Sequence, residues 1–143
     1  VDADLLRLPL PRAREDTIYT PHAGEFARLF GSVPKDLAER GRAVCKAAAD
    51  IGGVIVLKGE TDVISDGVRV RFNISGCEAM TVGGTGDVLS GICGGLLCRM
   101  PSFEAACAAV YAEGLAGEKA ASVVGDGMMP SDLLKEIAKV LWK

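Results

Sequence analysis

The feature that most constrains the fold is a run of four apolar residues, Val54-Ile55-Val56-Leu57, between Gly53 and Lys58. A strand that is apolar on both faces is typical of the middle of a parallel sheet covered by helices on both sides. Residues 17–20 form a second, shorter predicted strand, which ends at Pro21. The chain is therefore expected to build a layered α/β structure around these strands.

Two helices are predicted between the two strands. The first spans residues 24–31 and closes at Gly31, and the second runs from Pro34 to about Ile51, where Gly52-Gly53 stops it. The order strand, helices, strand predicts one βαβ crossover.

A hairpin is predicted after the apolar strand. Residues 62–65 and 68–72 flank Asp66-Gly67, a strong signal for a two-residue turn. The second arm alternates, which predicts that its apolar residues face the interior and its two arginines face solvent.

Three helices are predicted in the rest of the chain. One follows Asp87, one spans residues 103–124, and the last spans residues 131–141 with Ser131 as its N-cap. The helix after Asp87 is apolar almost all round, so we expect it to be buried. Close packing against a neighbouring backbone would explain its interior glycines, Gly91, Gly94 and Gly95.

The composition narrows the classes of function. Nearly half of the 143 residues are apolar, enough for one domain with a buried core, and the formal charge is only −3. The mixed charges give no basic patch, so we expect no nucleic-acid partner. No apolar run approaches the roughly 20 residues that span a bilayer, so we expect no membrane partner.

Five cysteines occur without any CxxC pair. Their odd number and spacing argue against a disulfide framework and against a zinc site. Cys45, Cys93 and Cys107 fall in apolar helical patterns, so they are predicted to act as small buried hydrophobic residues. This usage favours a reducing compartment, and we expect a cytoplasmic protein.

A glycine-rich turn at residues 83–86, Gly-Gly-Thr-Gly, runs directly into a helix, with Asp87 at the junction. Glycines leave backbone N–H groups uncovered where the helix dipole is positive, so the turn predicts an anion site. A carboxylate there makes sense as a base that takes a proton from a hydroxyl attacking phosphate. The local residues alone fit a helix-terminal charge or cap equally well.

Three polar motifs border apolar segments in a fixed order. Residues 20–25, Thr-Pro-His-Ala-Gly-Glu, follow the first strand, residues 57–59, Leu-Lys-Gly, end the second, and residues 84–87, Gly-Thr-Gly-Asp, open the buried helix. Ligands of parallel α/β sheets bind at the carboxyl ends of strands, so the three motifs can share one crevice.

This ordered set, TPHxGE, LKG and GGTGDVLSG, resembles the ATP- or ADP-dependent NAD(P)H-hydrate dehydratase family of the ribokinase-like superfamily. The resemblance covers essentially the whole chain, from Asp2-Ala3-Asp4 to the last helix. GTGD alone is shared by several ribokinase-like kinases, whereas the three motifs in order are strongly specific. The resemblance implies an α/β/α sandwich with a mostly parallel sheet, of which residues 1–143 form the C-terminal part.

The resemblance also implies roles for the motif residues. Asp87 would be the catalytic base, and the backbone of Gly84, Thr85 and Gly86 would form the anion hole for the transferred phosphoryl group. The residues implied to bind nucleotide are Lys58, Gly59, Glu60, Thr61, Asp62 and Gly86. Those implied to bind the hydrate are His22, Gly24, Glu25 and Asp87. No metal site built from protein ligands is predicted.

The implied reaction repairs damaged nicotinamide cofactors, with ATP or ADP as co-substrate, Mg²⁺ as cofactor and NADH or NADPH hydrate as substrate. Hydroxide is a poor leaving group, and phosphorylation of the hydroxyl on the reduced ring converts it into a good one. Elimination of phosphate then restores the ring double bond. A homo-oligomer is also expected.

The chain departs from the family pattern in two loops and in length. Cys77-Glu78 stands where Asn-Pro is common, and Asp62 stands where Thr is frequent. Family domains are nearly twice as long, and the chain opens at Val1 in what looks like the end of a strand. We therefore expect a domain truncated at its N-terminus, whose other half could be a separate chain.

Two other functions stay open. A ribokinase-like kinase of a small alcohol, such as a thiamine precursor, would use the same base and anion hole, although MTVGGTGDVLSG fits the dehydratase better. A catalytically silent half-domain that only associates with a partner chain is the second, and an exposed sheet edge with an apolar face would favour it.

Overall fold

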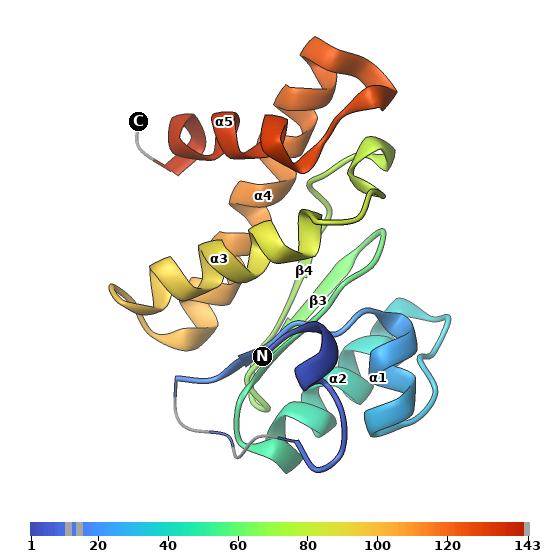
Figure 1. Ribbon diagram of the computed structural model, residues 1–143. Coiled ribbons are helices and arrows are strands. Elements are labelled where there is room, and N and C mark those ends of the chain that lie inside the picture. Colours follow the sequence, from blue (N-terminus) through green and yellow to red (C-terminus); the bar gives the residue numbers. More distant parts are fainter. Residues whose placement is uncertain (11–12, 14–15, 142–143) are drawn as a thin grey trace.

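The computed structural model describes residues 1–10, 13 and 16–141. A central sheet has the strand order β1 (Ile18–Tyr19), β2 (Val54–Leu57), β3 (Asp62–Ser65) and β4 (Val70–Asn73). One side of the sheet carries α1 (Ala23–Phe30) and α2 (Leu37–Ile51). The other carries α3 (Thr85–Leu97), α4 (Ser102–Val124) and α5 (Pro130–Leu141) (Figure 1). Short 3-10 helices are η1 (Ala3–Leu5), η2 (Glu78–Met80) and η3 (Gly125–Gly127).

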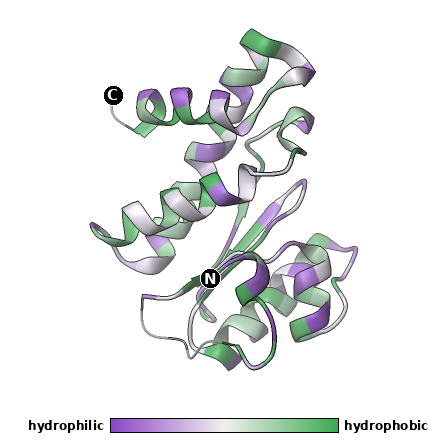
Figure 2. Ribbon diagram, viewed as in Figure 1, coloured by the Kyte–Doolittle hydropathy of each residue, from purple (hydrophilic) through white to green (hydrophobic). Residues whose placement is uncertain are grey.

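Strand β2 joins two hydrophobic cores, as its apolar run predicts. Val54 and Val56 pack with α3, α4 and α5, whereas Ile55 and Leu57 pack with α1 and α2. All four side chains are buried. Hydrophobic segments accordingly lie on both sides of the sheet (Figure 2). The predicted three-layer α/β/α arrangement is confirmed.

The sheet is mixed among the described strands. β1 pairs with β2 in parallel, with Ile18 opposite Val54, so the predicted βαβ crossover is present. β2 with β3, and β3 with β4, pair antiparallel because a hairpin reverses the chain. The sequence predicts a mostly parallel sheet, and the hairpin is the reason that these four strands differ from it.

The hairpin turn is longer than predicted. Ser65 pairs with Val70, so the loop contains four residues, and Asp66 accepts hydrogen bonds from the N–H groups of Val68 and Arg69 at 3.0 and 2.7 Å. Val68 therefore lies in the loop and is 87% exposed, and Phe72 on the edge strand is 45% exposed. The prediction that Val68 faces the interior is wrong, because Val68 belongs to the loop. Phe72 does face α2, where a Cβ on Gly41 would lie 3.0 Å from its ring, but it stays partly exposed because β4 has no described strand beyond it.

The buried-helix prediction for α3 holds on one face only. Five of its residues are buried against the sheet and α4, namely Val88, Leu89, Ile92, Cys93 and Leu96. A Cβ built on any of Gly91, Gly94 or Gly95 would meet no atom within 4 Å among the described residues. The expected close backbone packing is therefore absent from the described part of the chain.

Two helix starts also differ from the prediction. α2 begins at Leu37 rather than Pro34, because the Asp36 side chain accepts a hydrogen bond from the Glu39 N–H at 2.8 Å. α5 begins at Pro130, so Ser131 lies inside the helix.

Other expectations concern membranes and cysteines. The helices found in the described residues are all too short or too polar to cross a bilayer. All five cysteines are free, Cys93 is buried, and Cys45 and Cys107 are half-buried.

Glycine is required where α4 crosses the segment after β4. A Cβ on Gly114 would collide with the Ser75 hydroxyl and would lie 2.6 Å from the carbonyl carbon and oxygen of Ser75. The Ser75 hydroxyl in turn donates to Asn73 at 2.8 Å. This contact fixes the distance between α4 and the strand that borders the polar end of the sheet.

We expect Gly114→Ala to lower the free energy of unfolding of the full-length protein by about 1–3 kcal/mol, because backbone atoms cannot move aside as a flexible side chain can. Urea unfolding measures the change. Gly127→Ala is the matched control, since a Cβ there meets nothing within 4 Å. Equal stability of the two variants would contradict the assigned contact.

Candidate active site

The ends of β1 and β2 lie side by side. The backbone N–H of Lys58 donates to the Pro21 carbonyl at 2.9 Å, and His22 and Lys58 form a parallel bridge beyond the named strands. The first two motifs are therefore brought together at one edge of the sheet, as their positions after parallel strands predict.

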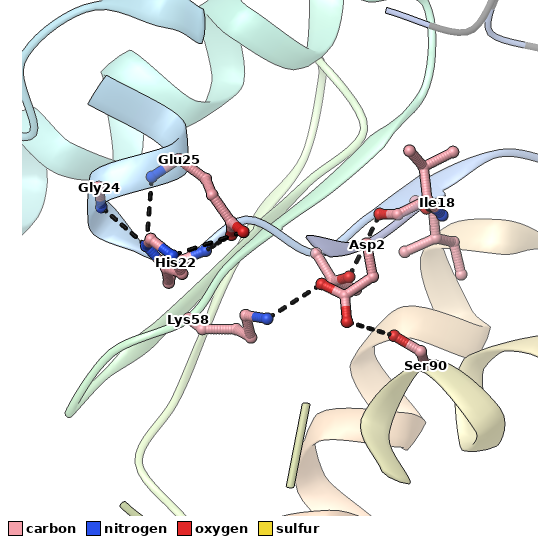
Figure 3. Close-up of polar contacts among 9 residues, drawn as sticks. Asp2, Ile18, His22, Gly24, Glu25, Lys58 and Ser90 are labelled. Atoms are coloured by element: carbon pink, nitrogen blue, oxygen red, sulfur yellow. Dashed lines mark hydrogen bonds and ion pairs between the residues drawn. The ribbon is translucent and has the colours of Figure 1, made fainter. Parts of the chain in front are cut away.

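The Lys58 side chain reaches from this edge to the N-terminal segment. Its ammonium pairs with Asp2 Oδ1 at 3.1 Å, and Asp2 Oδ2 accepts a hydrogen bond from the Ser90 hydroxyl at 2.9 Å. Asp2 thus lies between Lys58 and α3 (Figure 3). Burial alone would raise the pKa of Asp2, but hydrogen bonds from Thr20, Lys58 and Ser90 and the charge of Lys58 lower it below its usual value. Asp2 is therefore an ionised partner that holds the ammonium in place.

The glycine-rich turn meets the same ammonium. Gly84 is the N-cap of α3 with φ +104°, and a Cβ on it would lie 2.9 Å from Pro130, so only glycine fits there without strain. A Cβ on Gly86 would lie 3.3 Å from Lys58 Nζ. The lysine charge therefore adjoins the first turn of α3, whose N–H groups have no partners inside the helix.

Asp87 lies in this first turn and is exposed. Thr85 instead turns its hydroxyl toward the preceding loop, where it donates to the carbonyls of Met80 and Val82 at 3.2 and 3.1 Å. The side chain of Thr85 therefore stabilises the turn, and its contribution to an anion site would come from its backbone.

His22 begins α1. Its Nδ1 accepts hydrogen bonds from the N–H groups of Gly24 and Glu25 at 3.0 and 3.2 Å, and Glu25 returns the contact by accepting from the His22 N–H at 2.8 Å. This reciprocal capping box fixes the imidazole, whose Nε2 lies 3.4 Å from Glu25 Oε1. The His22 side chain is 58% exposed, so it stays open to a ligand while it caps the helix.

The predicted nucleotide loop, residues 59–62, is held by Asp62. Its carboxylate accepts hydrogen bonds from the Gly59 N–H at 3.1 Å and from Asn73 Nδ2 at 3.0 Å. Burial raises the pKa of Asp62 despite these bonds and the nearby charge of Lys58. Asp62 therefore stabilises the loop through its hydrogen bond with Gly59, whereas Gly59 and Glu60 are exposed to solvent.

One further acid lies beneath this edge. Glu113 of α4 is only 8% exposed, and its Oε1 has no hydrogen-bond partner among the described residues. Burial, together with the negative charges of Asp62 and Asp2, raises the pKa of Glu113 to about 8, although Lys58 opposes the shift.

Sequence reasoning misses three of these residues as members of the site: Asp2, Ser90 and Glu113. Two of them lie inside segments that carry the family resemblance, the Asp2-Ala3-Asp4 stretch and GGTGDVLSG. Glu113 is marked only by being a lone acid within the Ala- and Gly-rich stretch 105–117. A polar residue in an otherwise apolar helical stretch is the signal that could have identified it.

Within the described part of the chain, no group of three or more His, Cys, Asp or Glu side chains is arranged to hold a metal ion. The acids near Lys58 interact with its ammonium, Asp2 by direct pairing and Asp62 and Glu113 through their charges.

The chain resembles known proteins over nearly its whole length. A family model described as NAD(P)H-hydrate dehydratase matches residues 1–139. The chain is 53% identical over 143 residues to the bifunctional NAD(P)H-hydrate repair enzyme Nnr of Methanospirillum hungatei, a match that covers 99% of this chain and 29% of that protein.

Solved structures are similar as well. A crystal structure of the ADP/ATP-dependent NAD(P)H-hydrate dehydratase from Bacillus subtilis, co-crystallised with ATP and Mg²⁺, gives a TM-score of 0.84 at 34% identity, covering 98% of this chain and 52% of that chain. A ribokinase-like superfamily protein from Enterococcus faecalis gives 0.72 at 30% identity, covering 87% of this chain and 43% of that chain.

These likenesses confirm the predicted ribokinase-like fold. The chain spans about half or less of the length of the proteins it matches. Because the family model matches nearly every residue, the chain belongs to the NAD(P)H-hydrate dehydratase family.

Proposed function

We propose that this chain is the C-terminal part of one ribokinase-like domain and carries the phosphate-binding and catalytic edge of a nucleotide-dependent NAD(P)H-hydrate dehydratase. The observation that carries the proposal is the convergence of Lys58 and the first turn of α3, where Gly86 adjoins the lysine ammonium. A fixed positive charge beside the N–H groups of a helix N-terminus is suited to a phosphoryl group.

Asp87 is proposed as the catalytic base. It lies one residue after the glycine turn and is exposed, so a substrate hydroxyl can reach it. The N–H groups of Gly84, Thr85 and Gly86 would bind the phosphoryl oxygens while Asp87 takes the hydroxyl proton. The phosphate formed on the reduced ring then leaves by elimination, which restores the double bond.

The other predicted contacts are retained as proposals. Lys58 and the loop from Gly59 to Asp62 would border the nucleotide phosphates of ATP or ADP. His22, Gly24 and Glu25 would contact the hydrate of NADH or NADPH, with the imidazole oriented by the capping box. The matched Bacillus protein is named for ADP/ATP dependence, which supports this choice of nucleotide.

Mg²⁺ is proposed as the cofactor that enters with the nucleotide. Mg²⁺ keeps several waters and is bound mainly through substrate phosphates and one or two carboxylates, so it does not need a cage of protein ligands. The donor set around Lys58 fits this mode, since the described residues offer separate carboxylates and no three-ligand cluster. When bound, the ion would neutralise phosphate charge during transfer.

The full-length protein is proposed to work in the cytoplasm as a homo-oligomer. Five free thiols suit a reducing compartment. The remaining part of the domain, on the same chain or on a separate one, would supply further hydrate contacts.

We expect the full-length protein, with Mg²⁺ and ATP or ADP, to convert NADH hydrate to NADH and to release one phosphate per turnover. Recovery of the absorbance of reduced nicotinamide measures the reaction, and phosphate release is assayed in parallel. Reactions without nucleotide are the control. Phosphorylation of a thiamine-precursor alcohol, with no recovery of NADH, would instead establish the small-alcohol kinase.

A further inference from the structure

Glu113 is a buried acid that the proposed reaction does not use. It lies in the middle of α4, with 8% of its surface exposed and Oε1 unpartnered within the described part of the chain. Leaving a charged carboxylate in such a place is costly, because burial removes its water and no donor replaces that water at Oε1. A carboxyl group in this position is expected to bind a proton or a cation.

The titratable groups that interact electrostatically with Glu113 lie on four other segments of the chain. Asp62 lies at the start of β3, Lys58 follows β2, Asp2 belongs to the N-terminal segment, and Cys93 is buried in α3. Two of these groups are acids that compete for the single ammonium of Lys58. A further negative charge at Glu113 would therefore have no cation of its own.

A metal ion does not resolve this imbalance, since no three-ligand group suited to a metal exists among the described side chains. A proton does. Burial and the charges of Asp62 and Asp2 raise the pKa of Glu113 to about 8, so the group is mostly neutral at pH 7.

We propose that Glu113 is a positioning residue of the phosphate-binding edge, a buried neutral acid whose proton keeps Lys58 available to phosphate and whose ionisation weakens nucleotide binding. This inference rests on the proposed function, because it assumes that Lys58 and the first turn of α3 bind a nucleotide phosphate.

The effect follows from the charge around the ammonium. With Glu113 protonated, Lys58 is shared by Asp2 and the more distant Asp62, and its charge can still attract an anion. Loss of the Glu113 proton adds a negative charge in a region of low dielectric, where it both attracts the ammonium and repels phosphate. Protonation of Glu113 therefore raises the affinity for nucleotide, and bound nucleotide raises the affinity of Glu113 for its proton, as thermodynamic linkage requires.

The test measures ADP affinity of the full-length protein between pH 7 and pH 9.5, without Mg²⁺ and at constant ionic strength. We expect wild-type affinity to fall roughly tenfold more than that of Glu113→Gln, since one added unit charge near a bound anion is worth about that factor at an effective dielectric of about 20. Glutamine keeps the shape of the protonated acid and cannot ionise. Lysines lose charge at high pH in both proteins, so their contribution cancels in the comparison.

Glu104→Gln is the matched control. Glu104 lies on the same helix, is exposed and pairs with Arg69 at 2.7 Å on the hairpin loop, so the same substitution there removes a surface charge without altering the buried site. It should follow the wild-type profile. Parallel profiles of wild type and Glu113→Gln would overturn the inference. Failure of the wild-type protein to bind ADP at pH 7 would instead refute the proposed function.

Infrared difference spectra give a second measurement that does not depend on nucleotide. The wild-type protein should show a protonated carboxyl C=O band at pH 6.5 that Glu113→Gln lacks and that disappears by pH 9.5. Absence of this band at pH 6.5 would show that Glu113 is already ionised and would overturn the inference even if both proteins bind ADP.

Discussion

Asp87→Asn should lower the turnover of the full-length protein by roughly 10²–10⁴-fold, the range expected when a general base is lost. Asparagine has nearly the same shape, but its amide cannot accept the proton of the attacking hydroxyl. The turn from Gly84 to Gly86 and the Lys58 ammonium are untouched by the change, so ADP affinity should stay within a few-fold of wild type. Initial rates of NADH recovery and ADP titrations measure the two quantities.

Asp50→Asn is the control for this variant. Asp50 is exposed near the end of α2, on the other side of the sheet, and the same substitution there should leave turnover unchanged. Near-normal turnover of Asp87→Asn would show that Asp87 is only a charge at the helix terminus and not the catalytic base. Loss of ADP binding together with turnover would assign it to binding and not to proton transfer.

The second large effect concerns stability. Between pH 4.5 and about 8, an unfolded glutamate has lost its proton, whereas the folded state retains the proton of Glu113, whose pKa is raised from 4.5 to about 8 by burial and by Asp62 and Asp2. The folded state therefore binds more protons in this interval, and the free energy of unfolding falls as the pH rises. The contribution of Glu113 to this loss should be about 3–5 kcal/mol, at about 1.4 kcal/mol for each pKa unit.

Urea unfolding of the full-length protein at several pH values between 5 and 8 measures this dependence. Glu113→Gln should remove most of the decline and should be more stable than wild type at pH 8. Glu104→Gln should retain the wild-type slope, because Glu104 is exposed. An unchanged slope in Glu113→Gln would show that the buried acid titrates as an ordinary glutamate.

The sequence alone determined the layers and the meeting of two polar motifs at one edge of the sheet. The apolar run Val54–Leu57 requires hydrophobic layers on both faces of a strand, and the structure provides two separate cores there. The positions of TPHxGE and LKG after parallel strands predicted their meeting, which the His22–Lys58 bridge shows. Such features are local patterns of burial and chain direction, so they can be read from neighbouring residues.

Only the tertiary structure decided which side chains share the site. Asp2 and Lys58 are far apart in the sequence, and their contact depends on how the N-terminal segment packs beside the sheet and α3. The exposure of Val68 depends on the true hairpin register, which a one-dimensional alternation does not contain. In the sequence, Glu113 is simply one acid in a predicted helix. Its protonation depends on burial and on the charges of acids distant in the sequence, which only the packing of α4 in the folded chain determines.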